Sequence, residues 1–293
     1  MTKVVVLGSG GMLGSTVYGY LRKNRSFEVT GTTRDQFDAE AFASGVAQPQ
    51  ALNADYIINC IGVIKPFCKD NDAAGVRRAI AVNAVFPHRL AAAARAAKAR
   101  VIQIATDCVY SGTKGLYIET DTHDPLDVYG KTKSLGEVFD GSVLNVRCSI
   151  IGPELKNHVS LLDWFLANKD GDEVKGFTHH RWNGVTTLQF AKLCERILET
   201  TGLYDRLLAA SHTHHFLPNS TVNKYELLNL MNDAFGRKLR VQAVGNVGSA
   251  IDRTLASKYS LLQDVHPAGG IGTALAELAA YVREGAQRNR SPT

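Results

Sequence analysis

The sequence predicts an α/β protein with a doubly wound parallel sheet and a smaller C-terminal lobe. Short apolar runs recur through the first half of the chain, and helix-like stretches separate several of them. After about Gly152 the pattern changes to apolar helices joined by irregular loops that contain histidine and glycine. Strands that alternate with helices favour a parallel sheet with right-handed crossovers, and the change of pattern indicates a lobe laid over that sheet.

The first half of the chain contains five strand candidates. Val4–Leu7 is wholly apolar and runs directly into glycines, as expected of a strand buried on both faces of a sheet. The other candidates are Phe27–Thr30, Tyr56–Asn59, Val101–Ala105 and Val143–Val146. The strongest helix candidate is the alanine-rich stretch 73–98, which should bend near Pro87 because proline removes a helical hydrogen bond.

The second half should form most of the lobe. We predict a sheet domain over residues 1–152 and a smaller lobe over residues 153–284, from which some segments return to the sheet. Apolar helices are expected at Leu161–Leu166, Leu188–Leu198 and Tyr225–Phe235. The polar stretch 285–293 has no periodicity, so we expect a flexible tail there.

Composition and charge restrict the classes of function. The chain has 293 residues and a formal net charge of +5, and its Lys and Arg residues are scattered rather than clustered. This pattern argues against a nucleic-acid partner, whereas a mild positive field suits a small ligand that carries phosphate. No apolar run approaches the length of a membrane span, and the first residues do not form a signal peptide. We therefore expect a cytoplasmic protein that is not bound to a membrane.

The cysteines and histidines do not indicate a metal site. The five cysteines are odd in number, widely spaced and without a CxxC pair, so neither a disulfide framework nor a structural zinc is expected. The pair His179–His180 and the run 212–215 lack the companion ligands that a metal motif supplies. We predict no metal.

A glycine-rich turn follows the first strand. In the segment GSGGMLG the pattern GxGxxG fails because its third glycine would fall on Leu13, whereas GxxGxxG fits Gly8, Gly11 and Gly14. Such a turn lets a pyrophosphate approach the backbone and face the N-terminus of the next helix. The pattern predicts a Rossmann-type dinucleotide-binding domain over residues 1–152. The loop residues expected at the cofactor are Gly8, Gly10, Gly11, Met12, Leu13 and Gly14.

The end of the second strand indicates which dinucleotide binds. A site for NAD often places an acidic residue there on the ribose hydroxyls, but this chain has Arg34 in the sequence GTTR. A guanidinium can hold the 2′-phosphate of NADP(H) through a charge-assisted contact of about 1.5–3 kcal/mol. We predict NADP(H) as the cofactor, with Asp38 facing the adenine. A solvated surface arginine remains the alternative interpretation of Arg34.

A tyrosine, a lysine and a threonine are predicted to meet at the edge of the sheet. Tyr129 and Lys133 are four residues apart and share one face if residues 131–139 are helical. A nearby cation stabilises the phenolate and so helps tyrosine to act in proton transfer. Thr106 follows a predicted strand, at the edge where open α/β sheets bind ligands. Its hydroxyl can hydrogen-bond the reacting oxygen beside Tyr129.

The glycine turn and the motifs NCIGVI, AVNAVFPHRLA, ATDCVYSG and ETDTHDPLDVYGKTKSLGE occur in this order. With them the chain resembles an extended short-chain dehydrogenase/reductase, most of all the dTDP-4-dehydrorhamnose reductase group. The resemblance implies that Thr106, Tyr129 and Lys133 are catalytic. It also implies NADPH-dependent reduction of a 4-keto group on a nucleotide-activated deoxysugar, in polysaccharide or deoxysugar biosynthesis, with Tyr129 protonating the oxygen. The further cofactor residues it implies are Cys60, Ile61, Gly62, Asn83, Tyr129 and Lys133.

The substrate residues follow the resemblance less closely. Cys108 stands where the rhamnose reductases usually carry tyrosine, and the segment RWNGVTT is only loosely similar to their substrate-lobe motif. These differences concern the identity of the sugar more than the reaction. The residues expected at the substrate are Asp107, Cys108, His179, Arg181, Trp182, Asn183 and Arg253.

Three other functions compete with the reductase interpretation. A dehydratase is disfavoured because the sequence Thr106-Asp107-Cys108 lacks the second carboxyl group that elimination of water needs. A sugar-nucleotide epimerase on the same fold stays open. So does a non-catalytic NADP-binding subunit, since the regulatory subunit of methionine adenosyltransferase resembles the same group. The sequence specifies neither the nucleotide base nor the sugar epimer, and it leaves a homodimer open.

Overall fold

The computed structural model describes residues 1–46, 52–245, 248, 250–265 and 269–288. Its centre is a six-stranded sheet in the order β10-β5-β4-β3-β1-β2, and all neighbours in it run parallel. The bounds are β1 Thr2–Leu7, β2 Phe27–Thr32, β3 Tyr56–Asn59, β4 Arg100–Thr106, β5 Val143–Cys148 and β10 Thr213–His215. The doubly wound α/β prediction and its five strands are confirmed.

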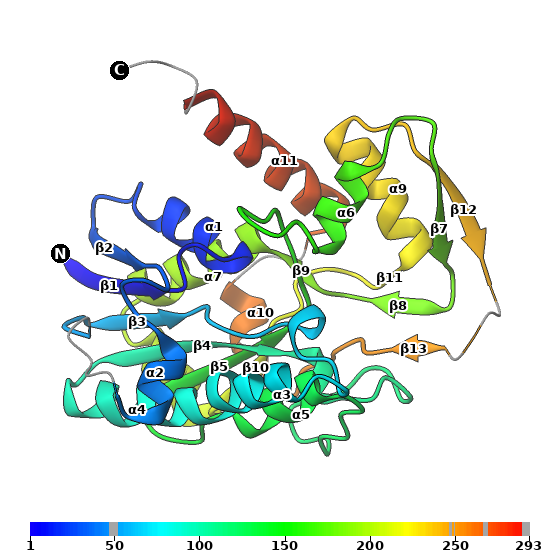
Figure 1. The fold of residues 1–293 in the computed structure, drawn as a ribbon. Helices are drawn as coiled ribbons and strands as arrows, with labels where there is room; N and C mark the ends of the chain where they lie inside the picture. The colour runs from blue at the N-terminus through cyan, green and yellow to red at the C-terminus, as the bar shows by residue number, and fades with distance from the viewer. Residues whose placement is uncertain (47–51, 246–247, 249, 266–268, 289–293) are drawn as a thin grey trace.

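Helices cover both faces of the sheet (Figure 1). Along β1, Val4 and Val6 pack into one hydrophobic core while Val5 and Leu7 pack into another, which is why the strand is wholly apolar. The first core is closed by α1 Met12–Leu21, α7 Thr187–Glu199, α8 Leu203–Ala210 and α10 Leu261–Val265. The second is closed by α2 Ala39–Ser44, α3 Ala73–Ala79, α4 Phe86–Ala96 and α5 Val128–Leu135.

The predicted long helix is interrupted where the sequence suggested. Between α3 and α4 lies a π-helical segment, η2, over Ile80–Val85. Pro87 stands in the first turn of α4, where a missing N–H costs no helical hydrogen bond. The wider π turn turns Asn83 into the protein, where its side chain is 1% exposed.

The lobe has a hydrophobic core of its own beside the sheet (Figure 1). The elements that form it are α6 Leu161–Ala167, β7 Glu173–Phe177, α9 Lys224–Phe235, β12 Arg240–Val244 and α11 Ile271–Arg288. Two short sheets join the lobe to the rest of the protein. One pairs β6 Ile150–Ile151 with β9 Val185–Thr186. The other has three strands, with β8 His180–Trp182 between β11 Val222–Asn223 and β13 Ile251–Asp252. Two 3-10 turns, η1 Lys65–Phe67 and η3 Asp107–Val109, follow β3 and β4.

One sequence prediction needs correction. The predicted tail 285–293 is wrong at its start, because residues 285–288 continue α11; residues 289–293 lie outside the described part of the chain. After residue 152 the segment 185–216 packs with the sheet through α7, α8 and β10, a return to the sheet that the sequence prediction allowed. Within the described residues, no helix combines the length and apolar character that a membrane crossing requires.

Candidate active site

The helix that carries the predicted tyrosine and lysine is held close to the end of β4. Asp127 caps α5 by accepting a hydrogen bond from the Gly130 backbone N–H at 2.8 Å. A Cβ atom on Gly130 would lie 2.2 Å from the Cys108 carbonyl oxygen. Only glycine therefore permits this approach of α5 to η3, and the approach brings Tyr129 to Thr106 at the end of β4.

Thr106 and Tyr129 lie together, as the sequence predicted. Both side chains line the same cavity, and the Thr106 hydroxyl donates to Asp107 Oδ1 at 3.2 Å. Burial raises the pKa of Tyr129 strongly, and the neighbouring Cys108 adds to this, while the hydrogen bond from Thr106 acts in the opposite direction. Tyr129 is therefore held as a neutral phenol at neutral pH.

Two lysines from different elements line the cavity together with this tyrosine. Lys133 is buried one turn along α5, and its Nζ donates to the Ile104 carbonyl oxygen at 2.9 Å. Burial lowers the pKa of Lys133 to about 8, against the opposing effect of Glu137. Lys65, at the start of η1, places its Nζ 5.8 Å from the centre of the Tyr129 ring. Lys65 is paired with Asp127 at 2.8 Å, the same carboxylate that caps α5.

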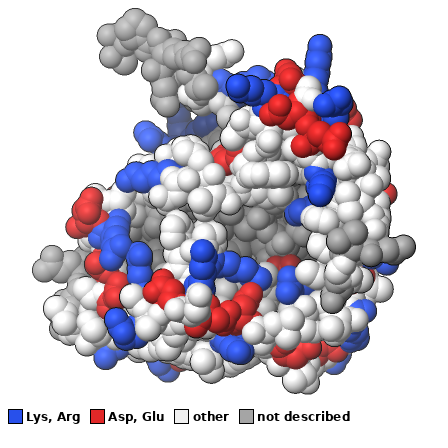
Figure 2. Space-filling model, turned by 45° about the vertical axis from the view of Figure 1, so that its right-hand side comes forward, with Lys and Arg blue, Asp and Glu red and all other residues white. Residues whose placement is uncertain are grey.

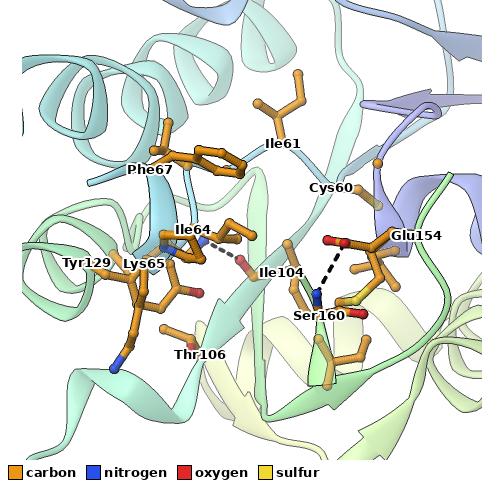
Figure 3. A pocket seen from close by; sticks show the side chains of 18 of the residues that line it. Cys60, Ile61, Ile64, Lys65, Phe67, Ile104, Thr106, Tyr129, Glu154 and Ser160 are labelled. Carbon is orange, nitrogen blue, oxygen red and sulfur yellow. Dashed lines mark hydrogen bonds between the residues drawn. The ribbon is translucent and has the colours of Figure 1, made fainter. Parts of the chain in front are cut away.

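These residues face a cavity of about 640 Å³ between the sheet and the segment that leads into the lobe. Its walls come from the carboxyl ends of β1, β3, β4 and β5 and from residues 149–161. Figure 3 shows Tyr129 and Thr106 on one side of the cavity, with Glu154 and Ser160 on the other. In Figure 2 a hollow opens on this face of the molecule, and basic and acidic side chains lie side by side along its lower edge.

The glycine turn forms the part of the cavity that suits phosphate. Gly8 has a φ of 80°, in the left-handed region, and a Cβ on Gly14 would lie 2.1 Å from the Gly8 carbonyl oxygen. Gly10 borders open space, since a Cβ there would meet no heavy atom closer than Thr33 Cγ2 at 3.9 Å. The cap of α1, Gly11, makes no side-chain hydrogen bond, and the first turn holds no acidic residue. The backbone N–H groups of this turn thus fit a pyrophosphate.

The structure separates the predicted cofactor residues into two groups. The residues that line the cavity are Gly10, Gly11, Met12, Leu13, Cys60, Ile61, Gly62, Tyr129 and Lys133. Asn83 does not line it. Its side chain binds the backbone N–H and carbonyl of Val63 at 2.7 and 2.9 Å and Thr132 at 3.2 Å. Asn83 therefore positions the loop that follows β3, and its contact with the cofactor stays a prediction.

Arg34 and Asp38 lie beside the glycine turn but outside the lining of the cavity. Asp38 Oδ1 caps α2 by accepting from Glu40 and Ala41 N–H groups at 2.8 and 3.1 Å. Its Oδ2 is 3.6 Å from Arg34 Nε. These backbone hydrogen bonds lower the pKa of Asp38 despite partial burial. Asp38 thus has a capping role that the sequence prediction missed, and its contact with adenine stays a prediction.

Two predicted substrate residues line the cavity, and a third, Arg253, lies outside its lining but close to Asp107. Asp107 and Cys108 line it, and burial raises the pKa of both. Arg253 reaches this point from the far end of the chain: its Nε donates to the Tyr110 carbonyl oxygen at 2.9 Å, and its charge opposes the effect of burial on Asp107. A negatively charged substrate group would meet Arg253 and Lys65 here.

The other four predicted substrate residues do not line the cavity, and their contact with a substrate stays a prediction. They lie on or next to β8, which pairs with β11 and β13. Trp182 donates to Ser149 Oγ at 2.7 Å, and Ser149 itself lines the cavity. Asn183 binds the Leu255 backbone at 2.7 and 3.0 Å, and Arg181 lies 3.7 Å from Asp252, so these two residues join β8 to the segment 252–255. His179 packs against the rings of Phe177 and His180.

The remaining histidines do not gather into a metal site: in the described part of the chain no group of three or more His, Cys, Asp or Glu side chains could hold a metal. His215 Nε2 instead lies 3.0 Å from Nη1 of the buried Arg147.

The sequence analysis did not identify six of the residues that line the cavity: Lys65, Phe67, Arg78, Glu154, Asn157 and Ser160. Lys65 could have been identified from its position directly after the motif NCIGVI.

The fold and the site together define an extended short-chain dehydrogenase/reductase, because a glycine turn after β1 and Thr106, Tyr129 and Lys133 share one cavity. Within this class the chain belongs to the family described as RmlD substrate binding domain, whose model matches residues 1–263. The resemblance stated from the sequence is thereby confirmed.

Individual relatives agree with this assignment. A dTDP-4-dehydrorhamnose reductase of Aggregatibacter actinomycetemcomitans is 31% identical over 147 residues, which cover 47% of this chain and 46% of that one. The chain thus matches less than half the length of this relative. Methionine adenosyltransferase 2 subunit beta of Bos taurus is 27% identical over 252 residues, 80% of this chain and 72% of that one.

A solved structure shows the same fold. It is a dTDP-4-dehydrorhamnose reductase from Bacillus anthracis in complex with NADP, with a TM-score of 0.77 and 16% identity, and the superposition covers 96% of this chain and 99% of that one. The fold therefore extends over nearly the whole chain, including the lobe.

Proposed function

We propose that this protein is an NADPH-dependent reductase that acts on the 4-keto group of a nucleotide-activated deoxysugar. The observation that carries the proposal is that Thr106, Tyr129 and Lys133 line one cavity with an open glycine turn. Its membership in a family with dTDP-4-dehydrorhamnose reductases among its relatives supports the choice of substrate class.

The residues present fit an NADP(H) molecule. The open face of Gly10 and Gly11 and the uncapped start of α1 would hold the pyrophosphate, and Arg34 lies beyond Thr33 for a 2′-phosphate. Lys133, which lines the same cavity, would hold the nicotinamide ribose. When bound, NADPH supplies the hydride that reduces the carbonyl carbon.

Tyr129 supplies the proton in this mechanism. A tyrosine phenol is protonated at neutral pH, so Tyr129 can give its proton to the oxygen of the substrate as that oxygen gains negative charge. Thr106 binds the same oxygen from the end of β4. The phenolate left behind would be stabilised by Lys133 and by the Lys65 ammonium over its ring. A neutral phenol with two nearby cations suits the direction of reduction.

The non-catalytic subunit is the second candidate function, because the alignment with methionine adenosyltransferase 2 subunit beta covers more of the chain than the alignment with the reductase. A protein of that kind needs the dinucleotide fold but no proton donor. The presence of Tyr129, Thr106 and a cationic substrate region in one cavity favours the enzyme. The epimerase is less favoured. An epimerase would usually retain its nicotinamide cofactor tightly, which is less consistent with an arginine, Arg34, that selects NADP(H).

The test is a panel of enzymatically prepared 4-keto sugar nucleotides, followed by NADPH absorbance and by analysis of the sugar product. The proposal expects one NADPH oxidised for each sugar reduced. An epimerase would convert the sugar without net oxidation. Binding of NADPH without turnover, together with a partner enzyme that co-purifies, would establish the subunit instead.

A further inference from the structure

Two arginines from separate elements share one carboxylate oxygen next to the glycine turn. Glu40 Oε2 lies 3.6 Å from Arg34 Nη2 and 3.7 Å from Arg78 Nε. Arg34 follows β2, Glu40 begins α2, and Arg78 is in the last turn of α3. Both separations are longer than a hydrogen bond, so the carboxylate lies between the two guanidinium groups without being held tightly by either.

One donor atom of Arg78, Nε, is unsatisfied in this arrangement, although 42% of the side chain as a whole is exposed. Its Nε is closed off from solvent and has no hydrogen-bond partner within the part of the chain that the structure describes. Arg78 also lines the same cavity as Gly10, Gly11 and Ile61, which are the walls predicted for the dinucleotide. A buried donor at the wall of a ligand cavity indicates a ligand atom that completes it.

We propose that Arg78 and Arg34 together bind the 2′-phosphate of NADP(H), and that Glu40 occupies the place of this phosphate in the nucleotide-free protein and opposes its binding. This inference rests on the proposed function. It assigns the selectivity between NADPH and NADH to Arg78 and Glu40 in addition to Arg34. No sequence motif had marked Arg78 or Glu40.

The chemistry of the three groups supports this assignment. A phosphate carries about two negative charges and several acceptor oxygens, so it can bind two guanidinium groups at once, whereas Glu40 offers them a single oxygen. The existing ion pairs are partly exposed and are therefore weak enough to be exchanged. NADH presents a ribose hydroxyl at this point, which can donate to Glu40. The arginines thus favour NADPH, and Glu40 favours NADH.

The test measures dissociation constants of NADPH and NADH by nicotinamide fluorescence, for the wild type and for Arg78→Ala and Glu40→Gln. We expect Arg78→Ala to weaken NADPH binding about 10-fold or more and to leave NADH nearly unchanged, since one charge-assisted contact is lost. Glu40→Gln should strengthen NADPH binding relative to NADH. Arg77→Ala is the matched control, because Arg77 is adjacent on α3 but exposed and outside the cavity lining.

Adenosine 2′,5′-bisphosphate and 5′-AMP, titrated by calorimetry, repeat the comparison without the nicotinamide. Equal weakening of both nucleotides in Arg78→Ala, or the same ratio in Arg78→Ala and Arg77→Ala, would overturn the inference while leaving the reductase intact. If Arg78→Ala does not fold, Glu40→Gln decides, and an unchanged or lowered preference for NADPH in that variant overturns the inference. A wild type that binds neither nucleotide overturns both this inference and the proposed function.

Discussion

The surroundings of a single phenol determine what Tyr129 can do. A tyrosine is protonated at neutral pH, so its proton is available for transfer, and burial raises the pKa of Tyr129 further. Thr106 and Lys65 lie where they can stabilise the charge that develops. The spacing of Tyr129 and Lys133 and the place of Thr106 after a strand were enough to predict this group from the sequence. Lys65 was not predicted, because its approach depends on η1 folding back toward α5.

Tyr129→Phe should lower kcat about 10²- to 10⁴-fold, because it removes the proton donor and little else. The dissociation constant of NADPH and the melting temperature should stay close to those of the wild type. Stopped-flow turnover and nucleotide titration on the same preparation check this. Turnover like that of the wild type would remove Tyr129 from the mechanism.

The pH dependence should report Lys133. Its pKa is lowered to about 8 by burial, so the free protein loses this ammonium as the pH rises through about 8. The value of kcat/KM for NADPH, which reports the free enzyme, should then fall on the alkaline side of this pH. Glu137→Gln removes a carboxylate that supports the charge of Lys133 and should move the fall to lower pH. A flat profile up to pH 9.5 in both proteins would contradict this assignment.

At the scale of elements, close approaches of backbone position the catalytic groups. Gly130 lets α5 contact η3, and the π turn at Ile80–Val85 lets Asn83 bind the backbone of Val63. Strand and helix positions followed from hydrophobic patterning, but the interruption of the long helix is the π segment Ile80–Val85 rather than a hydrogen bond lost at Pro87. These tertiary approaches could not be predicted, because no local pattern states which backbone segments will meet.

Gly130→Ala should reduce turnover more than it reduces stability. The new Cβ would lie 2.2 Å from the Cys108 carbonyl oxygen, so α5 must move away and carry Tyr129 with it. We expect a loss of about 1–3 kcal/mol in the free energy of unfolding, as for other overpacked positions, and a large fall in kcat. Gly141→Ala is the control, because no heavy atom lies within 4 Å of the added Cβ. Equal kcat in the two variants would contradict the positioning role of Gly130.

At the scale of the whole molecule, the last strand of the central sheet comes from a distant part of the sequence, after the first elements of the lobe. Residues 187–215 provide α7, α8 and the sixth strand β10, so the N-terminal domain is not finished at residue 152. The strand Thr213–His215 was missed because it is three residues long and two of them are histidines, which are buried here by contacts with Leu207 and Arg147. Similarly, Arg78 and Glu40 meet only because α2 and α3 cover the same face of the sheet.

Phe190→Ala should therefore destabilise the whole protein. Phe190 is 0% exposed in the core between α7 and the sheet, and its truncation should cost about 3–5 kcal/mol in the free energy of unfolding. Phe139→Ala is the matched control, since this side chain is 66% exposed and should change stability by only about 0.5 kcal/mol. Urea unfolding followed by circular dichroism checks both. Two separate transitions, only one of them shifted by Phe190→Ala, would show that α7 is not part of the sheet domain's core.

The most direct test of the central claim follows the hydride itself. NADPH deuterated at the transferable position of nicotinamide C4 is incubated with a 4-keto sugar nucleotide, and the product is analysed by mass spectrometry and NMR. The account predicts one deuterium at the former carbonyl carbon of the sugar for each NADPH oxidised, and no such transfer in Tyr129→Phe on the same time scale. A sugar product without deuterium, or no product from any member of the panel while NADPH binds, would contradict it.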